Sequence, residues 1–275
     1  MIVDSALSRV ANDLLRARDT ASLATLPSRS QAGFDLDKGY QVGRALHEGL
    51  VGRGYAPVGR KIGFTNRATW KEFQLDTPIW AHMYTQTVHF ADRAAFRLSL
   101  SGMAAPRIET EVVLRLRRPI PAGDPSVEEL ADCVEWAAIG FEFVDCHCPD
   151  WRFTAADAVA DFGLHAALVV GTPWQLESED PRQVVTQMQE LKVTMSRGTE
   201  IVAHGEGRNA LGSPLLALAH VARVVRTQSW ASPLSKGEII TTGTLTPLPP
   251  VSAREHWSVH VAGAPMATLE VDLDD

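Results

Sequence analysis

The chain has 275 residues, of which 45% are hydrophobic and 21% are charged, an ordinary composition for a globular protein with one large core. Its net charge of −7 argues against a nucleic-acid-binding surface, although a local basic pocket for an acidic substrate is compatible with it. No apolar run is long enough to cross a bilayer, and the N-terminus does not have the pattern of a secretory signal. Because three cysteines cannot all pair within the chain, we expect reduced thiols in a cytoplasmic protein.

Two helices are predicted at the start of the chain. Apolar residues recur at helical spacing over residues 2–18 and again over residues 35–50. Gly52 and Gly54 follow the second run, and glycine commonly ends a helix. We therefore expect a small helical N-terminal region over residues 1–54.

A β-rich region is predicted over residues 55–275, because short apolar runs are broken there by Gly and Pro. Two helices interrupt it, one near residues 127–136 and one that begins at Ser213 and Pro214, a capping residue followed by a favoured first-turn residue. No internal repeat or charged linker divides this region, so we expect one continuous catalytic domain. The predicted strands are 88–90, 107–116, 138–146, 166–170, 192–197, 238–242, 257–261 and 268–273.

Three glutamates stand out in the predicted strands. Glu109 and Glu111 are two residues apart, so both side chains point to one face of a strand. Two like charges side by side repel, and a hard divalent cation that took both as oxygen ligands would remove this cost. Glu142 lies between two phenylalanines, where an unpaired charge is expensive. Two alternatives stay open: the pair could line the wet face of an edge strand, and Glu142 could be a salt-bridge partner.

Lys61 lies between two glycines, Gly59 and Gly63, and glycine allows close approach of the backbone to a ligand. A lysine held near a metal or another cation has a lowered pKa, so it can exchange protons near neutral pH. Taken alone, the pattern favours a surface lysine at the end of a strand.

Other chemistries have weaker support in the sequence. A zinc site would need Cys133 together with Cys146, His147 and Cys148, but adjacent side chains on a strand point apart and this spacing closes a tetrahedron poorly. Ser213 is not part of a nucleophile elbow, so a helix cap is its simpler role. Neither a Walker loop nor a dinucleotide-binding fingerprint is present.

Several stretches, taken together in their order and spacing, resemble the 2-keto-4-pentenoate hydratase and 4-oxalocrotonate decarboxylase group of the fumarylacetoacetate hydrolase superfamily. The resemblance extends from about residue 35 to the C-terminus, and no single stretch would suffice for it. The matching stretches are Lys61-Ile62-Gly63-Phe64-Thr65, Pro106-Arg107-Ile108-Glu109-Thr110-Glu111, Gly140-Phe141-Glu142-Phe143-Val144-Asp145, Pro149-Asp150-Trp151, Ala160-Asp161, Leu211-Gly212-Ser213-Pro214-Leu215 and the run from Gly237 to Thr246.

The resemblance implies a magnesium or manganese site and the residues around it. Lys61 matches a lysine that is proposed as an acid–base group in the family, and Asp76 matches an acidic residue of a short conserved pattern. Thr242, Gly243 and Thr244 match a loop that lies by the substrate carboxylate. The metal ligands implied by the resemblance are Glu109, Glu111 and Glu142.

The chain departs from the usual hydratase pattern after the third glutamate. Family hydratases commonly read A-D-N-A-S-S where this chain has Phe162, Leu164 and His165 in place of an amide and hydroxyls, and His147 replaces the usual arginine. These changes fall where substrate-facing groups are expected, so Phe162 and His165 become candidate substrate-binding residues. The chain therefore resembles a divergent subgroup.

The fold implied by the resemblance is α+β, a mixed β-roll core with a small helical N-terminal region. The implied reaction is hydration of a 2-hydroxy-2,4-dienoate to a 4-hydroxy-2-oxo acid, as in aromatic meta-cleavage catabolism. Decarboxylation of an oxalocrotonate-type acid and hydrolysis of a carbon–carbon bond in an acylpyruvate need the same stabilisation of an enolate, so both stay open. The resemblance also implies a homo-oligomer and a pathway decarboxylase as a partner. A non-enzymatic alternative is a catalytically silent partner subunit that binds a 2-oxo acid.

Overall fold

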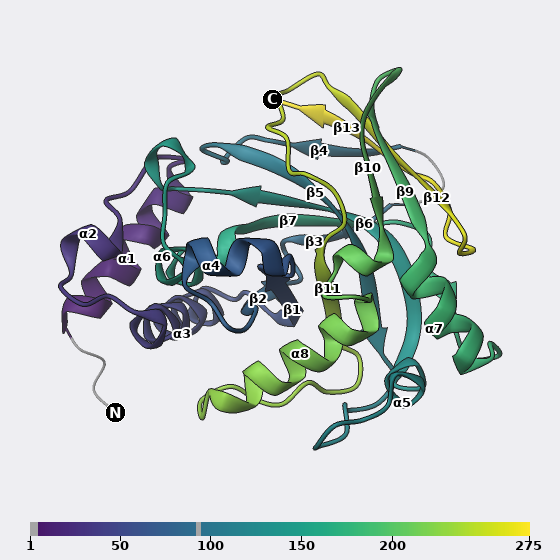
Figure 1. Ribbon diagram of the computed structural model, residues 1–275. Helices are drawn as coiled ribbons and strands as arrows, with labels where there is room; N and C mark the ends of the chain where they lie inside the picture. The colour runs from purple at the N-terminus through teal and green to yellow at the C-terminus, as the bar shows by residue number, and fades with distance from the viewer. Residues whose placement is uncertain (1–4, 92–94) are drawn as a thin grey trace.

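The computed structural model describes residues 5–91 and 95–275, and its chain begins with a group of helices at one end of the molecule (Figure 1). These are α1 (Ser5–Asp19), α2 (Pro27–Ser30) and α3 (Leu36–Gly52). Both long helices bury their apolar faces in a shared cluster, and Asp35 caps α3 by accepting the backbone N–H of Lys38 at 3.0 Å. The two predicted helices are confirmed over the described residues, and residues 2–4 of the first prediction lie outside them. That residues 1–54 form a separate region stays a prediction. Helix α3 packs against a later helix, α6 (Ala155–Ala160), so the two parts of the chain are in contact.

Two β-sheets form the rest of the molecule, and each of the eight predicted strands is present with ends shifted by at most four residues. The larger sheet has the order β2 (Ile79–Tyr84), β1 (Pro57–Gly63), β11 (Ile239–Thr244), β5 (Pro106–Leu116), β6 (Val134–Asp145), β7 (His165–Val170) and β3 (Val88–Phe90), with β8 (Trp174–Gln175) on β6. The smaller sheet has the order β10 (Glu200–Glu206), β9 (Lys192–Arg197), β12 (His256–Ala262), β13 (Leu269–Asp274) and β4 (Phe96–Ser99).

The remaining helices connect the strands and cover the sheets (Figure 1). Ser213 caps the longest of them as predicted, with its hydroxyl accepting the N–H of Leu215 at 3.3 Å. The helix expected near residues 127–136 ends at Ala131, because the chain from Val134 onward pairs with β5 instead. These helices are α4 (Trp70–Phe73), α5 (Val127–Ala131), α7 (Pro181–Glu190) and α8 (Pro214–Thr227), with short 3₁₀ turns η1 (Arg67–Thr69), η2 (Pro149–Trp151), η3 (Phe162–Leu164) and η4 (Gly207–Asn209).

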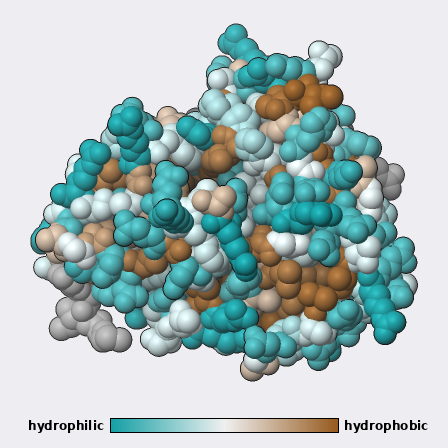
Figure 2. All heavy atoms as spheres, viewed as in Figure 1, coloured by the Kyte–Doolittle hydropathy of each residue, from teal (hydrophilic) through white to brown (hydrophobic). Residues whose placement is uncertain are grey.

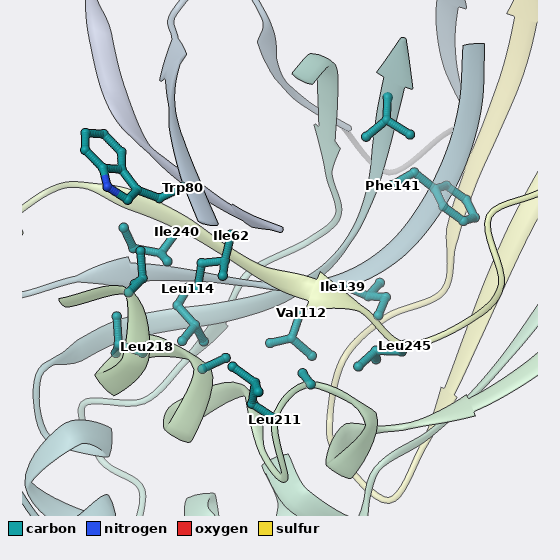
Figure 3. Packing of buried hydrophobic residues seen from close by; sticks show 14 of the residues in the cluster. Ile62, Trp80, Val112, Leu114, Ile139, Phe141, Leu211, Leu218, Ile240 and Leu245 are labelled. Carbon is teal, nitrogen blue, oxygen red and sulfur yellow. The ribbon is translucent and has the colours of Figure 1, made fainter. Parts of the chain in front are cut away.

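Strand β5 separates the main core from the polar site because its side chains alternate between two faces. Ile108, Val112 and Leu114 are fully buried in the main hydrophobic core, which β6, β11 and α8 also line (Figure 3). The alternate positions include Glu109 and Glu111, which therefore share the opposite face. The pleat of one strand thus places carboxylates beside a packed core.

The surface on the face seen in Figure 2 is mostly polar, with apolar side chains gathered in the region of α8 and α7. Leu216 of α8 is one of the exposed large apolar residues. Within residues 5–91 and 95–275, none of the helices combines the length and hydropathy that a bilayer span requires.

Candidate metal centre and active site

The antiparallel pairing of β5 with β6 brings the three predicted glutamates together. Glu109 lies directly opposite Glu142 in the register, and Glu111 is the next residue of β5 on the same face. One carboxylate oxygen from each of the three lies within 4.8 Å of the others. Gly140 lies opposite Glu111, and a Cβ atom there would collide with the side chain of Val113.

Each of the two fully buried carboxylates is held by further hydrogen bonds. Glu111 accepts the backbone N–H of Gly243 at 2.7 Å, and Gly243 has a φ of +94° that favours glycine. A Cβ atom at this position would also collide with the side chain of Thr65. Glu142 contacts Nδ1 of His165 at 2.9 Å and the hydroxyl of Thr241 at 3.4 Å.

His165 connects the carboxylate of Glu142 to the hydroxyl of Thr87. Its Nε2 lies 2.8 Å from the hydroxyl of Thr87, while Nδ1 faces Glu142. Burial lowers the pKa of His165 and outweighs the opposing effect of Glu142, so the ring is neutral. A neutral ring with its proton on Nδ1 satisfies both contacts, because Nδ1–H donates to the carboxylate and Nε2 accepts from the hydroxyl.

Lys61 reaches the carboxylates from β1. Its ammonium group donates to the carbonyl of Gly163 at 3.0 Å and lies 3.3 Å from Oε1 of Glu142. The lysine side chain is 4% exposed, so this ion pair is shielded from water. The neighbouring Arg60 points to the other face of β1 and pairs with Glu238 at 3.0 Å, as alternation along a strand requires.

Three carboxylates face a single lysine in this cluster, and the pKa values of all four groups are shifted. Burial raises the pKa of Glu109 to about 7, and burial together with the other two carboxylates raises the pKa of Glu111. Burial also acts to raise the pKa of Glu142, but Lys61 and His165 outweigh it and hold that pKa at about 2. For Lys61, burial acts to lower the pKa, yet the three carboxylates outweigh it and the pKa is raised.

A hard divalent cation fits this donor set. Oε1 of Glu111 is buried and has no hydrogen-bond partner among the described residues. Three carboxylates face one lysine, and oxygen donors of this type are the ones that magnesium and manganese prefer. A cation among the carboxylates would also offset the burial that raises the pKa values of Glu109 and Glu111.

A cavity of about 700 Å³ opens onto the cluster. Lys61, Glu109, Gly243 and Thr244 line it on the polar side. The guanidinium of Arg107, also on its wall, lies over a tryptophan ring at 4.2 Å from the ring centroid. The rest of the wall is mainly aromatic and aliphatic, with a few polar side chains such as Asn66, Asp150, His204 and Asn209. Its apolar members include Phe64, Phe73, Trp151, Phe153, Leu164 and Leu248. The cavity therefore offers a polar end at the carboxylates and an apolar body, as small-molecule sites commonly do.

Some predicted site residues lie elsewhere. Asp76 is exposed in a bend and is not one of the described residues that line the cavity. Phe162 has a φ of +55° and packs among the N-terminal helices, with Arg18 at 4.8 Å from its ring centroid. His165 lies behind Glu142, not on the cavity wall, and the hydroxyl of Thr242 donates to the carbonyl of Val112 at 2.8 Å. The structure thus gathers Lys61, the three glutamates, Gly243 and Thr244, and leaves Asp76 and Phe162 apart.

Sequence reasoning missed two contributors to the site, the carbonyl of Gly163 and the hydroxyl of Thr241, and missed one role of a third, Gly243. The carbonyl of Gly163, the backbone N–H of Gly243 and the hydroxyl of Thr241 all hold a charged group. Gly243 was predicted beside the substrate carboxylate, and the structure adds that its backbone N–H holds Glu111.

The zinc site that the sequence disfavoured, with Cys133, Cys146, His147 and Cys148 as ligands, does not form among the described residues. Cys133 lies apart and its thiol contacts the carbonyl of Glu129 at 3.1 Å. The ring of His147 hydrogen-bonds to Asp161 through Nδ1 at 2.7 Å. Cys146 and Cys148 do come together, with Asp161 as the third member of their cluster.

The chain is similar to known proteins over most of its length. Residues 50–272 match the family described as fumarylacetoacetate (FAA) hydrolase C-terminal. The chain belongs to the fumarylacetoacetate hydrolase family. The curated relatives of this family member include the 2-keto-4-pentenoate hydratase 1 of Dechloromonas aromatica, 30% identical with 91% of each chain covered. They also include the TodF product hydratase of Pseudomonas putida, 28% identical with 93% of this chain and 91% of that protein covered.

Solved structures confirm the α+β fumarylacetoacetate hydrolase fold with N-terminal helices. The 4-oxalocrotonate decarboxylase from Pseudomonas putida G7, complexed with magnesium and adipate, superposes with a TM-score of 0.87 at 19% identity, and 97% of each chain is covered. The fumarylpyruvate hydrolase from Pseudomonas aeruginosa, in complex with Mn²⁺ and pyruvate, gives a TM-score of 0.61 at 14% identity, with 80% of this chain and 90% of that chain covered. At these identities the likeness establishes the fold of the family.

Proposed function

We propose that this protein is a divalent-metal-dependent hydratase that converts a 2-hydroxy-2,4-dienoate to a 4-hydroxy-2-oxo acid. The observation that carries the proposal is the convergence of Glu109, Glu111 and Glu142 within 4.8 Å, beside Lys61 and at the polar end of a cavity. Magnesium or manganese is the cofactor that this donor set favours. When bound, such an ion supplies Lewis-acid stabilisation of the negative charge that an enolate carries.

Lys61 is the group we assign to proton transfer. Its position beside Glu142 and on the cavity wall supports a role as an N–H donor to the polar end of a bound substrate. Neutralisation of the three carboxylates removes the charges that raise the pKa of Lys61 and leaves burial, which lowers it. The loaded site therefore brings the lysine closer to the range in which a group both gives and takes a proton.

Substrate orientation is assigned to the rest of the cavity wall. The loop of Gly243 and Thr244 lies by the expected position of the substrate carboxylate, and the aromatic wall packs against the hydrocarbon part. Asp76 is proposed to orient water, as the family resemblance implies, and its exposed position makes this the least supported assignment. If Asp76→Asn keeps the turnover of the unmodified protein, the assignment fails.

Two other reactions are compatible with the same ligands. Decarboxylation of an oxalocrotonate-type acid is suggested by the structural likeness to a decarboxylase, at 19% identity, whereas the more similar curated relatives are named hydratases. Hydrolysis of an acylpyruvate would use the enolate as a leaving group. We rank hydration first because the relatives at 28% and 30% identity span nearly the whole chain. We also propose that the protein forms a homo-oligomer and that a decarboxylase of the same pathway is its partner.

A metal-supplemented substrate screen tests the proposed reaction. The purified protein is incubated with Mg²⁺ or Mn²⁺ and with 2-hydroxydienoates, oxalocrotonate-type diacids or acylpyruvates, while the conjugated ultraviolet band and released carbon dioxide are followed. We expect loss of the band of a monocarboxylic dienoate without carbon dioxide, and no loss when a chelator is present. Release of carbon dioxide from a diacid at a higher kcat/KM would replace hydration by decarboxylation. Metal binding without turnover of any of these acids would favour a silent binding subunit.

A further inference from the structure

A second cluster of potential metal ligands lies beyond the end of β6. Cys146 and Cys148 are two residues apart in extended chain, so their thiols lie on one side, and Asp161 approaches from the end of α6. One ligand atom from each lies within 4.8 Å of the others. The three residues are 0%, 3% and 1% exposed, which separates them from the acidic pairs that are common on surfaces.

The third ligand is already oriented by its neighbours. The carboxylate of Asp161 accepts the backbone N–H of His147 at 3.0 Å and faces Nδ1 of the same residue at 2.7 Å. Ligating carboxylates in metal sites are commonly held by hydrogen bonds of this kind. Nε2 of His147, which is buried and has no hydrogen-bond partner among the described residues, lies 3.5 Å from Asp145. His147 thus holds the carboxylate just beyond the end of β6 through its backbone N–H and Nδ1.

We propose that Cys146, Cys148 and Asp161 form a second metal site, for a thiophilic divalent cation of the zinc class. Thiolate ligands select zinc and similar ions over magnesium, whereas the carboxylates of the three glutamates suit magnesium and manganese. Binding converts two thiols to thiolates and releases two protons to solvent. The three side chains leave one position for a water molecule or a backbone oxygen. This site is separate from the proposed catalytic metal in its residues and in its chemistry.

The position of the cluster gives the ion a structural task. Cys146 follows Glu142 by four residues on the same chain segment, at the end of β6. Asp161 immediately precedes the turn whose Gly163 accepts from Lys61 and after which His165 contacts Glu142. An ion bound here joins the two segments that hold the charged groups of the catalytic site.

Cobalt substitution in the full-length protein tests the proposal, because Co²⁺ bound to thiolate has a sulfur-to-metal charge-transfer band and Co²⁺ bound to carboxylates does not. The protein is titrated with Co²⁺ in excess Mg²⁺. We expect one equivalent with the thiolate band, at least tenfold weaker binding in Cys146→Ser and Cys148→Ser, and unchanged binding in Cys133→Ser, the matched control. The double variant Glu109→Gln, Glu111→Gln should keep the band, which separates this site from the proposed catalytic one.

A measurement on the unmodified chain covers the case in which a cysteine variant does not fold. The protein is loaded with Zn²⁺ and treated with a thiol-binding mercurial, and released zinc is followed with a chromogenic chelator. We expect release of one zinc per chain as the thiols are blocked. Absence of a thiolate band with Co²⁺, a band that survives in both serine variants, or no zinc released by the mercurial would each overturn the proposal.

Discussion

Replacement of Lys61 by methionine separates the electrostatic role of this lysine from its catalytic role. Lys61→Met keeps the length and apolar stem of the side chain but removes the cation that pairs with Glu142 at 3.3 Å. Breaking a buried ion pair by removing one partner costs about 3–5 kcal/mol. A domain of roughly this size loses about 2–4 °C in Tm per kcal/mol, so the metal-free variant should melt roughly 6–20 °C below the unmodified protein.

Addition of Mn²⁺ should recover most of that loss but not the activity. A divalent cation among the carboxylates replaces the missing positive charge. Because the variant has no lysine to repel this cation, Mn²⁺ should bind to it at least as tightly as to the unmodified protein. Turnover should stay about 10²–10⁴-fold lower, the usual contribution of a proton-transfer group. Thermal denaturation with and without chelator, calorimetric titration with Mn²⁺ and the ultraviolet assay measure the three quantities.

The control for this experiment is Lys71→Met, at an exposed lysine of α4, which should change none of the three. Full turnover in Lys61→Met would refute its assignment to proton transfer. An equal loss of Tm with and without Mn²⁺ would refute the electrostatic reasoning, because a cation in the carboxylate cluster would then not replace the lysine charge.

Three further predictions concern the surroundings of the cluster. Gly243→Ala places a Cβ against Thr65 at a φ of +94° and displaces the N–H that holds Glu111, so Mn²⁺ affinity should fall about 10–100-fold; a change below twofold in calorimetry would contradict this. Metal-free protein should lose Tm as pH rises from 5 to 8, since Glu109, with a pKa of about 7, and Glu111 bind protons in the folded state that the unfolded chain has already released above its carboxylate pKa. The Mn²⁺-loaded protein should show a smaller slope, and equal slopes would contradict the account. Phe162→Ala should reduce stability by about 3 kcal/mol or more, while KM stays within twofold; a large rise in KM would return this residue to the substrate site.

The parts of the fold that the sequence predicted are those with a clean local pattern. Strand β5 alternates apolar and charged residues, and α3 and α8 begin at side-chain caps. Strands β1 and β2 were not predicted. The buried positions of β1 include Arg60 and Lys61, whose partners Glu238 and Glu142 lie far along the chain. The sequence around these residues therefore gives no sign of their partners.

The candidate site was predictable as a set of residues but not as a geometry. Shared orientation of Glu109 and Glu111 follows from the period of a strand, whereas the contact with Glu142 depends on the register between β5 and β6. The helix predicted near residues 127–136 ends early for the same reason, since pairing with β5 overrides helical spacing from Val134. Phe162 differs from the prediction because its backbone turns the ring toward the N-terminal helices.

Anomalous X-ray scattering from a crystal grown with Mn²⁺ tests the central claim most directly. We predict one manganese peak among the carboxylates of Glu109, Glu111 and Glu142, on the side of the cavity that Lys61 lines. No peak at that position under saturating Mn²⁺, or a peak whose ligands do not include these glutamates, would contradict it.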